Sequence, residues 1–221
     1  DINGKIFDPQ LGVKDLMNHT IKFIGDPQKR IEEDYLRIIR FIRFSLEYES
    51  KIEQTTIEAI KMNLDGIRKI SKERILSELF KILSTKSFVK ITNNKQLKEI
   101  FTLIFAEFKY LERLNKLVNT SNKSNFDKKT LLAIMLIDEK NNHEYFSHKY
   151  NVSNELKGTL DLIAQNFQII QKNKEFFQKD LKKNTYFFGK THLMTLNTLN
   201  FTSNKKIKIK NYFDALNNIK K

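Results

Sequence analysis

The side chains best suited to chemistry lie in one stretch, residues 25–44, which reads GDPQKRIEEDYLRIIRFIRF. On a continuous helix, with about 100° between successive residues, Arg30, Asp34 and Arg37 project within roughly 60° of one another. One carboxylate and two guanidinium groups then face the same space. The alternative is a solvated helix face, on which ion pairs at i, i+3 and i, i+4 are ordinary and contribute little.

A carboxylate beside a guanidinium can distinguish nucleobases by their hydrogen-bonding edges. Cytosine and adenine each offer an exocyclic amine next to a ring-nitrogen acceptor. Asp34 can accept from the amine while Arg37 donates to the ring nitrogen. Uracil and guanine present a carbonyl oxygen and an N–H instead, and each unpaired buried polar group costs roughly 1–3 kcal/mol. The pair is therefore a template that serves both C and A.

The same stretch carries the signals of a helix that positions this pair. Asp26 and Pro27 are typical of an N-cap and of a first helical position. The apolar residues then recur with a helical period and predict a buried face, made of Ile31, Tyr35, Ile38, Ile39, Ile42 and Leu46.

The remaining sequence predicts a mainly all-α fold, an extended helical array with a few short N-terminal β-strands. After Pro27 there is no proline and there are only three glycines, so helix breakers are scarce. Residues 1–24 are the only β-prone part, with a tight turn favoured at Asn3-Gly4. Ser71 is a candidate N-cap. Helices are expected at 55–64, 71–83, 97–118, 131–137, 154–180, 184–198 and 204–219, with a polar break at 119–125.

Three ordered motifs resemble those of the class II tRNA nucleotidyltransferases, which include the CCA-adding enzymes and bacterial poly(A) polymerases. Residues 33–37 match the family's nucleobase-reading motif EDxxR. Upstream, residues 8–16 resemble its DPxGGxxDL segment, with Leu11 where a glycine is usual. Downstream, residues 70–79 resemble its IS-x-ERI-xx-EL segment. The resemblance covers roughly residues 1–83.

This resemblance implies a role for each matching residue. Asp34 and Arg37 would read the base, and we include Arg30, Glu33 and Arg40 in the nucleotide-binding set. Arg30 would neutralise a phosphate or pair with Glu33, while Arg40 would anchor the helix to its neighbours. Two further residues, Glu73 and Arg74, would brace the template helix through a buried ion pair.

The resemblance also implies a reaction that this chain does not complete alone. Family members transfer CMP or AMP from CTP or ATP to an RNA 3′ end, using Mg²⁺ held by carboxylates of a head domain. Neither the DxD motif nor the glycine-rich turn of that head occurs here, and the chain begins at Asp1 inside a β-prone run. We therefore expect a head domain in cis or in trans, and no catalytic residue or metal ligand within this chain.

The resemblance further suggests four domains. Residues 1–24 would end the head, 25–95 would form a nucleobase- and RNA-binding neck, 96–150 a body and 151–221 an RNA-binding helical tail.

Composition favours a polyanionic partner. The formal net charge of the 221 residues is +14, which suits RNA or an anionic membrane surface, although a lysine-rich genome bias explains part of it. No apolar run is long enough to cross a membrane. There is no cysteine, which fits a cytoplasmic setting and excludes thiolate metal sites. His143 and His148 lack the spacing of a helical metal pair.

The C-terminal part combines lysines with aromatic residues, a pattern that suits RNA. The candidate RNA-binding residues are Lys182, Lys183, Lys190, Lys205, Lys206, Lys208 and Lys210. An ordinary terminal helix pair with solvated lysines is the alternative. For the whole chain, the alternative to part of a tRNA nucleotidyltransferase is a standalone basic α-helical RNA-binding module or pseudoenzyme fragment.

Overall fold

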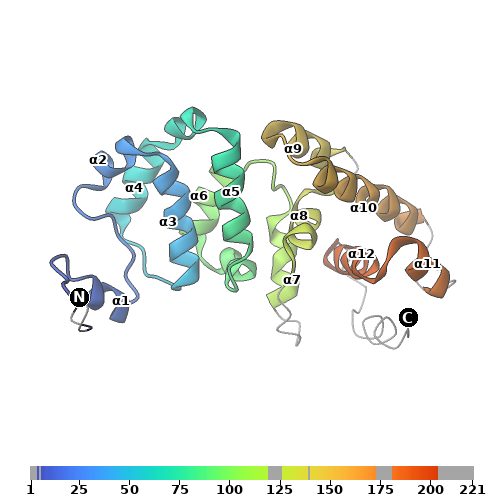
Figure 1. The fold of residues 1–221 in the computed structure, drawn as a ribbon, viewed down its shortest axis with the longest axis horizontal. Coiled ribbons are helices and arrows are strands. Elements are labelled where there is room, and N and C mark those ends of the chain that lie inside the picture. Colours follow the sequence, from blue (N-terminus) through green and yellow to red (C-terminus); the bar gives the residue numbers. More distant parts are fainter. Residues whose placement is uncertain (1–3, 5, 119–125, 139, 173–180, 204–221) are drawn as a thin grey trace. The chain divides into compact units, whose positions relative to one another are not determined.

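A computed structural model describes residues 4, 6–118, 126–138, 140–172 and 181–203 (Figure 1). Within these residues the regular secondary structure consists of α-helices and short 3₁₀ helices, which confirms the predicted all-α class. The chain divides into two compact units, Asp1–Phe105 and Ala106–Lys221, and each is described by itself. The assignment of functional domains along the chain stays a prediction.

The first unit packs its helices in pairs, with α2 against α4 and α3 against α5. In chain order its elements are α1 (Gly12–Met17), α2 (Pro27–Glu33), α3 (Leu36–Glu47), α4 (Gln54–Met62), η1 (Leu64–Lys69), α5 (Lys72–Leu83), η2 (Phe88–Asn93) and α6 (Lys95–Ile104).

Local sequence explains where these helices begin. The Asp26 carboxylate accepts from the backbone N–H of Lys29 at 3.0 Å, with Pro27 at the first position of α2. Ser71 caps α5 by accepting from the N–H of Arg74 at 3.4 Å. Both predicted caps are confirmed.

The predicted apolar arc supplies much of the first unit's core. Five of its six members are buried, and Ile31, Ile38, Ile39 and Ile42 are each 0% exposed. Only Tyr35 remains half-buried. From the facing helix α5, Leu79 and Ile82 are also fully buried, so α3 and α5 share one apolar interface.

The prediction of one continuous helix over residues 25–44 is wrong. Helix α2 ends at Glu33 and α3 begins at Leu36, with Asp34 in an extended conformation between them (φ −155°, ψ 102°). An aspartate favours this break because its side chain can accept from nearby backbone N–H groups in place of a helical carbonyl.

The prediction of N-terminal β-strands is also wrong for the described residues of this region, which form no strand. The one pairing there is an isolated parallel bridge between Thr20 and Lys51. A β-prone run needs a ladder of partners before it becomes a strand. Instead, the Asp8 carboxylate accepts from the N–H groups of Gly12 and Val13, at 2.7 and 2.8 Å, and starts the short helix α1.

The backbone conformation of Leu11 suits the glycine that the resembling motif usually has at this position. Its φ is 58°, in the left-handed region that glycine adopts without strain. A leucine there costs roughly 1–2 kcal/mol.

The second unit consists of η3 (Leu111–Leu114), α7 (Asn115–Val118), α8 (Lys128–Leu136), α9 (Asn142–Tyr150), α10 (Asn154–Lys172), α11 (Leu181–Phe188) and α12 (Lys190–Ser203). Helix α12 packs against α8, α10 and α11, and its residues from Thr195 to Asn200 are all buried. The core of this unit therefore lies around α8, α10 and α12.

Several predicted helix boundaries need correction. The helix expected at 97–118 is broken between Ile104 and Leu111, and the one expected at 184–198 is divided at Gly189, whose φ is 77°. Helix α9 was not expected. The polar break at 119–125 and the terminal helix at 204–219 lie outside the described residues. Of the helices described, none is both long and apolar enough to span a membrane.

Candidate functional site

The break between α2 and α3 places Asp34 at a fixed corner. Its Oδ1 accepts from the backbone N–H of Leu36 at 3.1 Å, and its carbonyl oxygen accepts from the N–H of Arg37 at 3.0 Å. These bonds satisfy N–H groups at the start of α3, which would otherwise lack helical partners. The carboxylate is thus part of the fold and is still 28% exposed.

Tyr35, the residue after Asp34, packs closely against Gly66. The Tyr35 ring lies directly over Gly66 in η1, where an added Cβ atom would overlap the ring atoms. Gly66 is buried, and the ammonium group of Lys69 lies 5.4 Å from the centre of the Tyr35 ring. A side chain at position 66 is therefore excluded by the position of Tyr35.

Arg37 is oriented by the helix that precedes its own. Its Nη1 donates to Glu33 Oε2 and to the carbonyl oxygen of Arg30, both at 2.7 Å. The side chain is 30% exposed. Both bonds use the same nitrogen, so Nη2 and Nε have no hydrogen-bond partner within the part of the chain that the structure describes.

Glu33 connects the two arginines. It accepts from Arg30 Nη1 at 2.7 Å as well as from Arg37. The hydrogen bond from Arg37 and, more weakly, that from Arg30 lower the pKa of the Glu33 carboxyl below its ordinary value. Glu33 is therefore ionised at neutral pH and keeps both guanidinium groups in place.

Asp34 receives its second partner from α5. Arg74 Nη2 donates to both carboxylate oxygens, at 3.3 and 3.2 Å. A carboxylate offers about four lone-pair positions, and Leu36 and Arg74 occupy three of them. Asp34 can therefore accept one more hydrogen bond, and Arg37 still has three N–H donors.

Arg74 thus contacts Asp34, but the expectation of a buried ion pair is wrong. The Arg74 side chain is 52% exposed, and Glu73 is also exposed. Both residues lie in the first turn of α5, where solvent reaches them. The pKa of the Glu73 carboxyl is lowered by a hydrogen bond from its own backbone and, to a smaller extent, by one from the Ser71 side chain.

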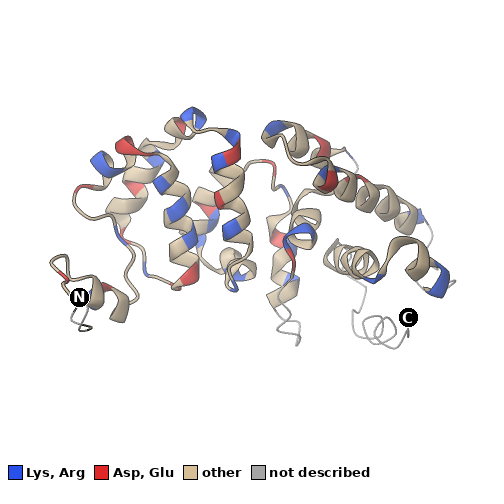
Figure 2. Cartoon of the chain, in the orientation of Figure 1, with Lys and Arg blue, Asp and Glu red and all other residues tan. Residues whose placement is uncertain are grey.

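Arg40 and Arg43 of α3 both contact Glu78 of α5, and an anchoring role was expected for Arg40. Arg40 Nε lies 3.5 Å from Glu78 Oε1, and Arg43 Nε lies 3.2 Å from Glu78 Oε2, while Lys81 Nζ reaches Oε1 at 2.8 Å. The Glu78 side chain is only 3% exposed. Burial by itself raises the pKa of Glu78, but the hydrogen bond from Lys81 and the nearby charges outweigh it, and the pKa is lowered. Figure 2 shows the basic residues along α3 and α5.

Replacing Glu78 by glutamine should lower the free energy of unfolding by about 1–2 kcal/mol at neutral pH, because three cations lose their shared anion. The lowered pKa means that this contribution is present above the ordinary value of 4.5 and is lost as the pH falls through the folded-state pKa. Urea unfolding at pH 7 and about pH 3 should show a difference that shrinks in acid.

The matched control is Glu47→Gln. Glu47 lies 3.7 Å from Arg43, but its side chain is 48% exposed, so it should change the stability by less than about 0.5 kcal/mol. Equal stability of the Glu78→Gln variant and the parent at neutral pH would show that Glu78 does not hold α3 to α5.

The predicted RNA-binding lysines that the structure describes belong to other elements than α2, α3 and α5. Lys182, Lys183 and Lys190 belong to the second unit and are exposed, the first two on α11 and the third at the start of α12. Lys205, Lys206, Lys208 and Lys210 lie outside the described residues.

The described residues do not fit a Mg²⁺ site. No three Asp, Glu or His side chains among them converge as ligands for a metal ion. The His143 side chain is 3% exposed, and its Nε2 lies 3.4 Å from Asp161 Oδ1, so its neighbour among these residues is a single carboxylate.

Sequence reasoning missed two residues that shape the site. Gly66 follows the helix expected at 55–64, where the sequence indicates only a helix end, and its close approach to Tyr35 depends on the fold. Glu78 belongs to one of the three motifs, but its burial beneath three cations depends on the packing of α3 against α5.

Comparisons with known proteins give the site a context. Residues 51–94 match the family model described as the probable RNA- and SrmB-binding site of polymerase A. The chain is 45% identical over 82 residues to the CCA-adding enzyme of Lactobacillus helveticus, covering 37% of this chain and 21% of that protein. It is 36% identical over 111 residues to the CCA-adding enzyme of Staphylococcus saprophyticus, covering 50% of this chain and 26% of that protein.

A solved structure shows the same fold. The CCA-adding enzyme of Bacillus stearothermophilus, crystallised in complex with CTP, matches with a TM-score of 0.75 and 17% identity. The match covers 98% of this chain and 54% of that chain, so this chain spans about half of the relative's length. At this identity the likeness shows the fold alone. Together with the sequence matches, it confirms the predicted resemblance.

Proposed function

We propose that this chain, which is similar to the CCA-adding enzymes, is the base-selecting and RNA-binding part of a tRNA nucleotidyltransferase or poly(A) polymerase. In this proposal Asp34 and Arg37 read the incoming nucleotide, and Glu33 and Arg74 position them. The observation that carries it is that both reading groups are held in place and still keep unused hydrogen-bonding capacity.

Base selection follows from what remains available at each group. Asp34 can only accept, so its vacant lone pair suits the exocyclic amine of cytosine or adenine. Arg37 can only donate, so Nη2 or Nε suits the neighbouring ring nitrogen. Neither group can exchange its role, because a carboxylate has no hydrogen to donate and a guanidinium has no lone pair to accept with. Uracil and guanine would place an acceptor against Asp34 and a donor against Arg37.

The fixed orientation of the Arg37 side chain increases the discrimination between bases. If Arg37 rotated freely, it could turn away from a mismatched N–H at little cost. Glu33 and the Arg30 carbonyl oxygen hold its Nη1, so a mismatched base leaves polar groups unpaired. In this proposal Arg30 keeps Glu33 in place and is available to a phosphate, because its side chain is 42% exposed. Arg40 supports α3 and does not touch the base.

The reaction itself needs a head domain that holds Mg²⁺ and presents the RNA 3′ end. In the proposed reaction CMP or AMP passes from CTP or ATP to the RNA 3′ hydroxyl, and the metal would assist that transfer. In this proposal the head domain holds the metal, and the described residues bind and orient the nucleotide and the RNA. RNA binding is supported by the polymerase A family match at residues 51–94 and by the excess of basic residues.

The test is to join this chain to the head domain of a CCA-adding enzyme and measure nucleotide addition to a tRNA that lacks its 3′ end. We expect incorporation from CTP or ATP and little from UTP or GTP, while the 221-residue chain alone gives no transfer. Transfer by the chain alone would place the chemistry within it. A hybrid protein that is active but indifferent to the base would contradict the template and favour a general RNA-binding module.

A further inference from the structure

Helix α11 carries two lysines and two aromatic residues in a repeated arrangement. Lys182 precedes Tyr186 by four residues, and Lys183 precedes Phe187 by four residues. Residues four apart lie on the same side of a helix, so each lysine has an aromatic side chain one turn beyond it. The two stripes are adjacent and form a two-by-two array, which we call the α11 array.

The array lies on the exposed side of α11, opposite the side that packs against α12. All four members are exposed, whereas Leu181, Asn184, Thr185 and Phe188 are half-buried. On that packed side the Phe188 ring stacks on His192 of α12, with centroids 5.5 Å apart and planes at 26°. The array therefore faces solvent, while the opposite side of α11 packs against α12.

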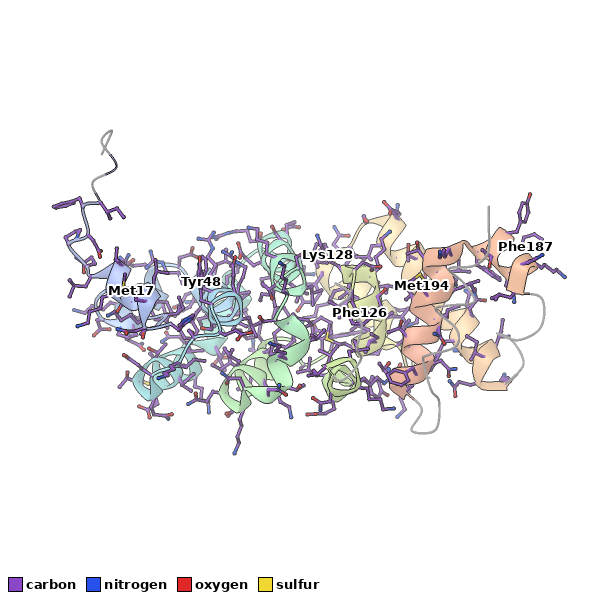
Figure 3. All side chains as sticks on the ribbon, turned by 90° about the horizontal axis from the view of Figure 1, so that it is seen from below. Met17, Tyr48, Phe126, Lys128, Phe187 and Met194 are labelled. Atoms are coloured by element: carbon purple, nitrogen blue, oxygen red, sulfur yellow. The ribbon has the colours of Figure 1, made fainter. Side chains whose placement is uncertain are left out.

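The two aromatic rings of the array are adjacent and largely exposed to solvent. Tyr186 is 86% exposed and Phe187 is 66% exposed. Their centroids are 5.5 Å apart at an interplanar angle of 83°, so the rings meet edge to face. Figure 3 shows Phe187 projecting outward from α11, away from the helix that carries Met194. Exposed apolar surface of this kind is typical of a binding site.

The charge around the rings identifies the kind of partner. Residues 181–203 contain three lysines, at 182, 183 and 190, and no acidic residue. Lysines attract phosphates, while flat aromatic faces stack on bases that are not paired. Because the rings are nearly perpendicular, each offers its own face to a base instead of joining the other in one apolar strip.

We propose that the α11 array binds an unpaired RNA segment, with bases stacked on Tyr186 and Phe187 and phosphates held by Lys182 and Lys183. A base-paired helix cannot use this site, because its bases are already stacked on one another. The choice of RNA as the ligand class rests on the proposed function, since the same chain matches an RNA-binding family model at residues 51–94. The geometry of the array is independent of base selection at Asp34.

The test measures how tightly the full chain binds a fluorescently labelled 12-nucleotide poly(A) RNA and a duplex RNA of equal length. The Tyr186→Ala/Phe187→Ala variant should bind the single strand roughly 10- to 100-fold more weakly, with an unchanged salt slope, because stacking and not charge is lost. The Lys182→Gln/Lys183→Gln variant should reduce the slope of log K against log salt by about 1.4 units.

Controls separate stacking from folding. Tyr145 in α9 is also exposed, at 60%, so Tyr145→Ala is a matched loss of a surface aromatic residue and should leave affinity unchanged. Tyr186→Phe keeps an aromatic face and should bind as the parent does. Since the chain has no tryptophan, Tyr186→Trp provides a single reporter whose fluorescence should be quenched by the poly(A) strand.

The experiment distinguishes a failure of the array proposal from a failure of the proposed function. If the parent binds RNA and the aromatic double variant binds equally well, the array is not the site, and the proposed function is untouched. Equal losses for single strand and duplex would also overturn stacking. No binding of either RNA by the parent, together with binding to anionic phosphatidylserine vesicles, would make the array a membrane contact and contradict the RNA assignment.

Discussion

Replacing Arg37 or Asp34 by alanine in a head-containing protein is expected to lower kcat/KM for CTP and ATP by roughly 10- to 100-fold and to relax base choice. Each substitution removes one charge-assisted hydrogen bond to the base. The penalty for a mismatched base disappears with it, because uracil and guanine no longer meet an opposing group. The measurement is the ratio of kcat/KM values for CTP and ATP to those for UTP and GTP.

The matched control lies on the same unit. Asp65 and Arg68 form another aspartate–arginine pair at i, i+3, with a separation of 3.7 Å, and their side chains are 93% and 87% exposed. Alanine at either position removes the same charge and should leave base choice unchanged. Unchanged base ratios in both the Asp34 and the Arg37 variant would leave these residues only their ion pairs with Arg74 and Glu33.

Gly66→Ala is expected to destabilise the first unit by about 1–3 kcal/mol, because the new methyl group overlaps the Tyr35 ring. Displacing Tyr35 also moves its neighbour Asp34, so base choice should relax as well. A double-mutant cycle with Tyr35→Ala tests the mechanism, since the cost of Gly66→Ala should largely vanish once the ring is removed. Urea unfolding, with hydrogen exchange in α3, provides the measurement.

A second glycine provides the control for this substitution. Gly158 lies in α10, and an added Cβ there meets nothing within 4 Å. Gly158→Ala should therefore stabilise α10 by roughly 0.5–1 kcal/mol, the usual gain for a helix interior. If Gly66→Ala costs the same with and without Tyr35, the ring does not hold the corner.

The sequence predicted those features that depend on neighbours along the chain. Caps at Asp26 and Ser71 and the apolar face of residues 31–46 follow from residue type and period, and the structure confirms them. The three motifs led to the resemblance because their order and spacing are visible in one dimension.

Features that depend on tertiary packing were not predictable in this way. The period of the apolar residues runs through Asp34 without interruption, so it gave no sign of the break, which is stabilised by hydrogen bonds with Leu36, Arg37 and Arg74. Residues 20–24 are β-prone, yet within the described residues only Thr20 pairs, with Lys51. Propensity does not reveal whether a partner strand exists.

Four helices together position the two side chains of the proposed template. Arg37 is carried by α3 but takes its direction from Glu33 and Arg30 at the end of α2. Helix α2 is in turn tied to the end of α4, where Asn63 donates to Gln28 Oε1 at 2.6 Å. Asp34 takes its direction from α5 through Arg74.

Under the proposed function, such a template can be tuned without altering the residues that read the base. A substitution at Gln28 or Asn63 would shift α2 and with it Arg37, whereas a change at the start of α5 would shift Asp34. Either change would alter the relative position of the two reading groups. Base preference would then depend on helix packing far from the nucleotide, and selection could act on it there.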